Sequence, residues 1–163
     1  MASGDTLLVF KPIDNEPPAS NYATIDQRNS HMVLDFDTTT GEAAVFSGVI
    51  PRNYAGSGIT VYIHYAMTSA TTGTCGWLVG FERIGDAQQD IDSDGFAADQ
   101  TVTAVTVDGT TGNVDIVNVA VSNGANMDSI AVGESFRLKI TRDVANDTAA
   151  GDAELIAVEL KET

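Results

Sequence analysis

The chain has 163 residues, a length that suits one domain built around a single hydrophobic core. Hydrophobic residues make up 43% of the chain and its mean hydropathy is +0.00, which argues against both a disordered and a membrane-embedded protein. Its 23 acidic and 8 basic side chains give a formal charge of -15. Such a surface repels phosphate backbones and anionic lipids, so we expect a soluble protein with neither nucleic acid nor membrane as partner.

The N-terminal residues lack a basic region followed by an apolar stretch, so the sequence predicts a protein that stays inside the producing cell. Cys75 is the one cysteine and cannot form an intrachain disulfide. Stability must therefore come from packing, from a partner or from oligomerisation.

Short runs rich in β-branched and aromatic residues recur along the chain, separated by clusters of Gly, Asn, Asp, Ser and Pro. Nine runs are predicted as strands: 6–10, 31–36, 43–50, 59–67, 75–84, 100–107, 113–121, 135–141 and 153–160. Strands of this number and length predict an all-β fold, a jelly roll or two-sheet antiparallel β-sandwich.

Alternation within the runs predicts their buried faces. In the fourth run one face carries Ile59, Val61, Ile63 and Tyr65. In the last run Ile156, Val158 and Leu160 are predicted to point inward, opposite Glu159. Gly76 and Gly80 interrupt the fifth run, which indicates a bulge or a central strand there.

Two segments are predicted to lack regular structure. Residues 11–30 contain Pro12, Pro17 and Pro18, which predict an extended N-terminal arm that a neighbouring subunit could order. We therefore divide the chain into a strand and arm over 1–30 and a single sandwich domain over 31–163. Residues 108–112 are predicted to form a hairpin loop between two strands, and a helical turn is possible near 126–130.

The second segment without predicted regular structure, residues 85–99, carries the one motif with metal-like spacing. Asp90, Asp92 and Asp94, followed by Gly95, match the first half of a calcium-binding loop. The twelfth position of that loop is Thr101 where a bidentate Glu is required, so a helix-loop-helix calcium site is rejected. A looser calcium site on a β loop and a solvated acidic turn are the two alternatives, and no other cofactor is expected.

Catalysis has few candidate groups. His31 and His64 are the only side chains with an ordinary pKa near neutrality, and Cys75 lies in an apolar run typical of a core residue. Gly-x-Ser-x-Gly is absent from the sequence, and carboxylate pairs such as Glu82 with Asp86 are expected by chance among 23 acids. We predict that the protein is not an enzyme.

Aromatic side chains offer a different function. Exposed aromatic rings on one face of a sandwich can stack on sugars, although Tyr65 and Trp77 have the pattern of core residues. The candidates are Tyr22, Tyr54, Tyr62, Tyr65 and Trp77.

The pattern of the whole chain resembles the small structural proteins of tailed bacteriophages, and in size and β character it is most similar to capsid decoration, or cement, proteins. The resemblance rests on residues 7–18, 33–37, 46–54, 81–83 and 136–143. It implies a homotrimer on the capsid exterior of a virion, made in the host cytoplasm, that bridges subunits of the major capsid protein and reinforces the shell. The alternative is a carbohydrate-binding or receptor-binding β-sandwich module, such as a tail or fibre component.

Overall fold

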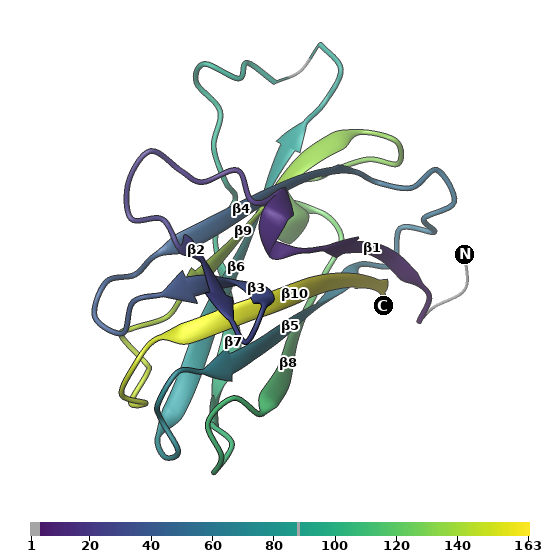
Figure 1. The fold of residues 1–163 in the computed structure, drawn as a ribbon. Helices are drawn as coiled ribbons and strands as arrows, with labels where there is room; N and C mark the ends of the chain where they lie inside the picture. The colour runs from purple at the N-terminus through teal and green to yellow at the C-terminus, as the bar shows by residue number, and fades with distance from the viewer. Residues whose placement is uncertain (1–3, 88) are drawn as a thin grey trace.

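The computed structural model describes residues 4–87 and 89–163 and is an all-β sandwich of two antiparallel sheets. One sheet has the order β2-β3-β10-β5-β8, with β1 also paired to β10, and the other has the order β4-β9-β6-β7 (Figure 1). The strands are β1 (Thr6–Phe10), β2 (Thr24–Arg28), β3 (His31–Phe36), β4 (Ala43–Val49), β5 (Ile59–Met67), β6 (Thr74–Ile84), β7 (Gln100–Thr106), β8 (Val114–Val121), β9 (Ser135–Arg142) and β10 (Ala153–Glu162). Two short 3-10 helices, η1 (Pro12–Asp14) and η2 (Ala125–Met127), lie in the connections.

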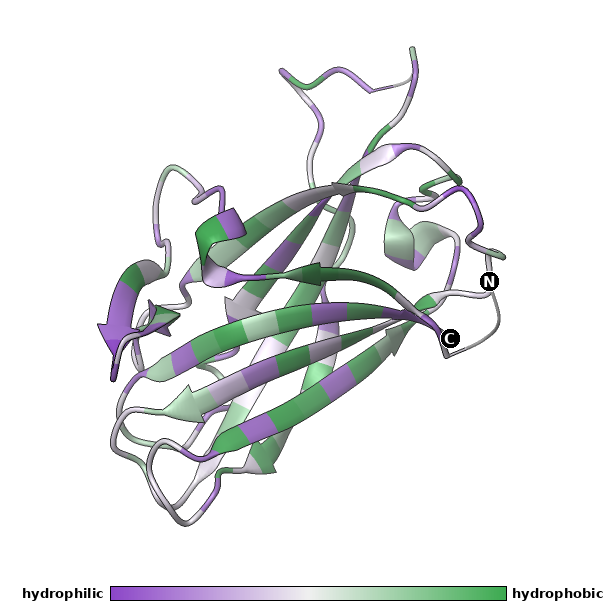
Figure 2. Cartoon of the chain, turned by 45° about the vertical axis from the view of Figure 1, so that its right-hand side comes forward, coloured by the Kyte–Doolittle hydropathy of each residue, from purple (hydrophilic) through white to green (hydrophobic). Residues whose placement is uncertain are grey.

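The predicted fold class is confirmed. Each of the nine predicted runs corresponds to a strand, and the predicted and observed ends differ by at most two residues. Hydrophobic and hydrophilic residues alternate along several strands (Figure 2). The core lies between the two sheets. Trp77 is fully buried there, and its ring meets Phe36 at 5.0 Å and Tyr65 at 5.3 Å between centroids. Among the described residues no helix has the length and apolar character needed to cross a membrane.

The segment predicted as an arm lies against the chain's own sandwich. Asn15 Oδ1 accepts a hydrogen bond from the backbone of Val45, and Ala23 N donates to Ala43 O, so residues 15–23 cover the outer edge of β4. β2 follows and pairs with β3 from Thr24 to Arg28, across the predicted boundary at residue 30. The prolines do exclude a continuous strand, but Glu16 and Asn21 also form backbone hydrogen bonds with Val45 and Ala43 of β4.

β2 is the strand that the sequence analysis missed. Its five residues, Thr-Ile-Asp-Gln-Arg, are mostly exposed and polar, and strands of that kind carry little hydrophobic periodicity.

The predicted hairpin over 108–112 is wrong. The segment does turn, with Asn113 N donating to Thr110 O, but β7 belongs to the four-stranded sheet and β8 to the six-stranded sheet. Composition identifies a turn and does not distinguish a hairpin from a crossing between layers.

Two bulges change the faces of their strands. The pairing of β6 with β7 shifts between Cys75 and Trp77, where Gly76 was predicted to allow a bulge. The pairing of β10 with β5 shifts between Leu155 and Ala157, so Ile156 is the extra residue. Ile156 is therefore half-exposed rather than inward as predicted, whereas Val158 and Leu160 are buried as expected.

Candidate functional site

The outer face of the six-stranded sheet holds rows of side chains set by strand register. Residues directly opposite one another in an antiparallel pair point to the same side. One row runs across the sheet from Asp35 through Glu154 and Ala66 to Val114. The next rows place His64 beside Ile116, and Tyr62 between Glu159 and Asn118.

A pocket of about 470 Å³ opens at the end of this face that lies beneath the β2–β3 hairpin. Its apolar surface comes from Val33, Ala66, Val114 and Ile156. Its polar groups come from Arg28, Asn29, His31, Thr111, Asn113 and Glu154. A pocket of this size with an apolar floor and a few converging polar groups is typical of a small-molecule site.

The bulge in β10 creates part of the floor. Without the extra residue, Ile156 would share the inward face of Val158 and Leu160. With it, Ile156 lies on the outer side, next to Val33 and Ala66 in the pocket lining.

Arg28 closes one side of the pocket. Its Nη1 donates to a carboxylate oxygen of Glu154 and, at 2.9 Å, to the backbone carbonyl of Met67. Gly112 packs closely against the same guanidinium. A Cβ added at Gly112 would lie 3.0 Å from Arg28 Nη2, so a larger residue would crowd the arginine. Arg28 thus connects β2, β10 and the 107–113 crossing.

Two other polar side chains of the pocket have a further hydrogen-bonding atom that a ligand could use. The Nδ1 of His31 lies 3.0 Å from the carbonyl of Asn29, which leaves Nε2 on the far side of the ring. Asn113 uses its amide nitrogen to donate to Asp108 at 2.9 Å, and its amide oxygen is a further acceptor.

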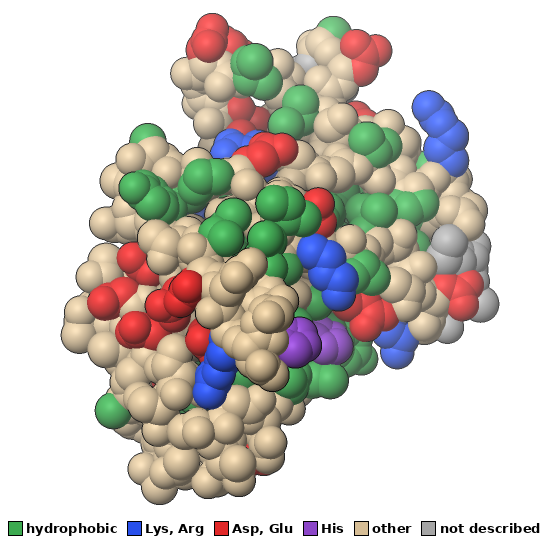
Figure 3. All heavy atoms as spheres, in the orientation of Figure 1, with side chains coloured by type: hydrophobic (Ala, Val, Ile, Leu, Met, Phe, Trp, Pro, Cys, Tyr) green, Lys and Arg blue, Asp and Glu red, His purple; other side chains and the backbone are tan. Residues whose placement is uncertain are grey.

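Asp35 makes the neighbourhood of the pocket acidic. Burial, followed by the negative charges of Asp152 and Glu154, raises the pKa of Asp35 to about 6. Its buried Oδ1 has no hydrogen-bond partner among the described residues. Acidic side chains gather on the β2 and β3 side of this face (Figure 3).

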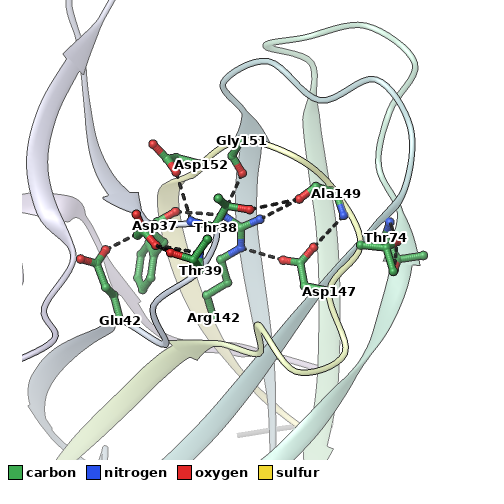
Figure 4. Close-up of polar contacts among 12 residues, drawn as sticks. Asp37, Thr38, Thr39, Glu42, Thr74, Arg142, Asp147, Ala149, Gly151 and Asp152 are labelled. Atoms are coloured by element: carbon green, nitrogen blue, oxygen red, sulfur yellow. Dashed lines mark hydrogen bonds and ion pairs between the residues drawn. The ribbon is translucent and has the colours of Figure 1, made fainter.

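Arg142 holds the strand ends that flank the pocket (Figure 4). Its side chain is buried, pairs with Asp147 at 2.7 Å, and donates to the carbonyls of Phe36 and Gly151. Asp152 accepts from the backbone of Thr38, which ties the start of β10 to the end of β3. These bonds fix the segments that place Asp35 and Glu154 side by side.

Of the predicted sugar-stacking aromatics, three are in the interior and two are accessible. Tyr54, Tyr65 and Trp77 are buried. Tyr22 is exposed but bridges to Ala43 at the edge of the other sheet. Tyr62 is on the outer face of the six-stranded sheet, where Lys161 Nζ lies 5.7 Å from its ring centre.

The groups considered for catalysis are dispersed. Cys75 is buried, and that burial raises the pKa of its thiol to about 12, so it is a core residue. Glu82 forms an ion pair with Arg137 at 2.8 Å, whereas Asp86 is exposed. His31 lines the pocket and His64 lies in the adjacent row.

The acidic loop is organised by its own turn. The backbone carbonyl of Asp90 accepts hydrogen bonds from the backbone amides of Ser93 and Asp94. The side-chain Oδ1 of Asp90 accepts from the backbone amide of Asp92, and the Asp94 carboxylate accepts from the side-chain amide of Gln89. Within residues 4–87 and 89–163, no three His, Cys, Asp or Glu side chains gather closely enough to form a metal-binding group. Calcium binding by Asp90, Asp92 and Asp94 stays a prediction.

Most of the pocket was missed by sequence reasoning. Arg28, Asn113 and Glu154 are far apart in the chain, and only strand order brings them together. The available signal is the polar run Arg28-Asn29-Ser30, which the sequence analysis places in the arm, directly before the predicted strand that begins at His31; in the structure it is the turn of the β2–β3 hairpin.

The sequence matches no protein-family model and no curated protein. Solved structures do match in fold. A family 35 carbohydrate-binding module from an environmental isolate aligns with a TM-score of 0.55 at 13% identity, over 96% of this chain and 94% of that one. Xyl-CBM35 in complex with a glucuronic acid containing disaccharide gives 0.56 at 13% identity, with the same coverage. A module from Cellvibrio mixtus lichenase 5A in complex with cellotriose gives 0.55 at 13%, over 98% and 99%.

These neighbours overturn the resemblance to capsid decoration proteins. The fold that the chain shares over nearly its whole length is that of carbohydrate-binding modules. The inferred function of shell reinforcement, the major capsid protein as partner and the homotrimer are corrected accordingly. The resemblance rested on short β segments, and segments of that kind occur in sandwiches of many functions.

Proposed function

We propose that this protein is a carbohydrate-binding module whose ligand lies in the pocket on the outer face of the six-stranded sheet. The observation that carries the proposal is the pairing of an apolar floor with a polar rim in that pocket. A sugar ring has apolar C–H faces and hydroxyl edges, and such a pocket complements both.

Fold likeness supports the same class. The similar structures are carbohydrate-binding modules, and two of them are complexes with a disaccharide and with cellotriose. One fold can serve many functions, and it is the lining of the pocket that favours a sugar as ligand.

Binding without catalysis is part of the proposal. The buried thiol of Cys75 has a raised pKa, and Glu82 is held by Arg137. Neither residue lines the pocket.

Calorimetric titration with cellotriose and xylohexaose tests the proposal. Saturable binding is expected. Thr111→Met places a larger side chain in the lining of the pocket and should weaken sugar binding several-fold. Thr110→Met is the matched control, because Thr110 is the exposed neighbour that does not line the pocket. No binding across neutral, acidic and amino-sugar glycans would contradict the proposal.

A further inference from the structure

Arg28 is the only Lys or Arg among the described residues that line the pocket. Its guanidinium is already paired with Glu154, whose side chain is 7% exposed. An arginine free of a carboxylate partner would offer its fork to a carboxylate on a ligand. Here the protein supplies that carboxylate itself, so the charges of Arg28 and Glu154 offset one another.

The remaining charge near the pocket is negative. Asp26 lies opposite Val33 in the β2–β3 register and shares the outer face with the pocket floor. Asp35 is next to Glu154 across the β3–β10 pair, and Asp152 is close enough to act on Asp35. A ligand carboxylate would meet these charges, and Arg28, whose charge could balance them, is already paired with Glu154.

We infer that the pocket selects uncharged glycans and disfavours glycans that carry a uronate, because Glu154 pairs with Arg28 and offsets its charge. This inference rests on the proposed function and names its ligand class. It separates this chain from the neighbour that is a complex with a glucuronic acid containing disaccharide, although the two share a fold.

Cellobiose and cellobiouronic acid are a matched pair of probes, since they differ only in a hydroxymethyl group against a carboxylate. Their affinities are measured by NMR titration at pH 8, where an ordinary imidazole is neutral. At low salt the neutral sugar should bind about fivefold tighter, and the ratio should shrink in 1 M salt, because screening weakens the repulsion.

Glu154→Gln is the decisive variant. It keeps the shape of the side chain and releases the charge of Arg28, so the preference for the neutral sugar should disappear or reverse. Asp26→Asn makes the same change in net charge on β2 without touching the ion pair, and it should change the ratio less. Its circular dichroism and that of Glu154→Gln should match the parent chain.

The outcomes separate the two proposals. If the parent chain binds the uronate as tightly as cellobiose or more tightly, the inference is wrong while glycan binding stands. If Glu154→Gln changes the ratio no more than Asp26→Asn, the ion pair does not set the selectivity and the inference is also wrong. If none of the sugars tested, xylohexaose and cellotriose included, binds at all, the proposed function itself is wrong.

Discussion

Arg28 on β2 and Glu154 on β10 form an ion pair across β3, the strand that separates them in the sheet. Glu154 is the more buried partner, with 7% of its side chain exposed against 33% for Arg28. The pair therefore closes the pocket on one side and balances a carboxylate that has little access to water.

The first prediction concerns this asymmetry. Arg28→Gln leaves the Glu154 charge buried without its partner and should lower the free energy of unfolding by about 2 kcal/mol. Glu154→Gln removes the buried charge and should cost less than about 1 kcal/mol. Urea denaturation of both variants at pH 7 measures the difference, and equal losses would contradict this account of the pair.

Asp35 predicts a pH dependence of stability. Its folded pKa of about 6 lies above the ordinary value of 3.8, so the folded state holds the proton more tightly. The stability that this provides is fully present below pH 3.8 and is lost as the pH rises through 6. Asp35→Asn should therefore stabilise the protein at pH 8 by about 1 kcal/mol, allowing for partial solvent screening, and have little effect at pH 3.5.

Asp37 is the control of opposite sign. Hydrogen bonds from the side chain and backbone of Thr39 and the backbone of Thr40 lower its pKa to about 2. The stability that these bonds give is present above pH 3.8 and is lost as the pH falls through 2. Asp37→Asn should therefore destabilise the protein at pH 6. Thermal midpoints of Asp35→Asn and Asp37→Asn are measured from pH 3.5 to 8, and a rise or a fall of both midpoints together at neutral pH would contradict these assignments.

The two histidines are a matched pair for locating the ligand. His31 lines the pocket and His64 lies in the next row of the same face. His31→Ala removes a hydrogen-bonding ring and should weaken glycan binding about tenfold, whereas His64→Ala should change it less than about twofold. Calorimetric titration measures both, and equal losses would place the ligand along the sheet rather than in the pocket.

Removal of residues 1–30 tests whether the sandwich needs the N-terminal segment. This deletion takes away β1 and β2 and uncovers the edges of β4 and β10. It should abolish cooperative unfolding, because the segment supplies paired strands and buries Phe10, Pro12 and Ala23. A truncated chain with a sharp thermal transition near that of the full chain would show that the segment is dispensable.

Calcium binding by the acidic loop is the last prediction. If Asp90, Asp92 and Asp94 hold calcium, millimolar calcium should raise the thermal midpoint above its value in chelator, because a ligand stabilises the state that binds it. The triple substitution of these residues by Asn should remove that rise. Equal midpoints with calcium and with chelator would show that the segment is a solvated acidic turn.

Strand positions could be predicted from the sequence because alternation is a local signal. The run from Ile59 to Met67 has the same ends in the sequence prediction and in the structure. β2 could not be found in this way, since its residues are nearly all exposed and mostly polar and so show no alternation of apolar and polar positions. Only its pairing with β3 identifies it as a strand. The pocket needed information that no local pattern contains, namely that β10 lies between β3 and β5 and that a bulge turns Ile156 outward.

Mapping of backbone amide shifts during titration with xylohexaose tests the central claim most directly. The account predicts saturable shifts concentrated at residues 28–33, 111–114 and 154–156, the segments that line the pocket. Saturable shifts confined to another part of the sandwich, or no shift at millimolar sugar, would contradict it.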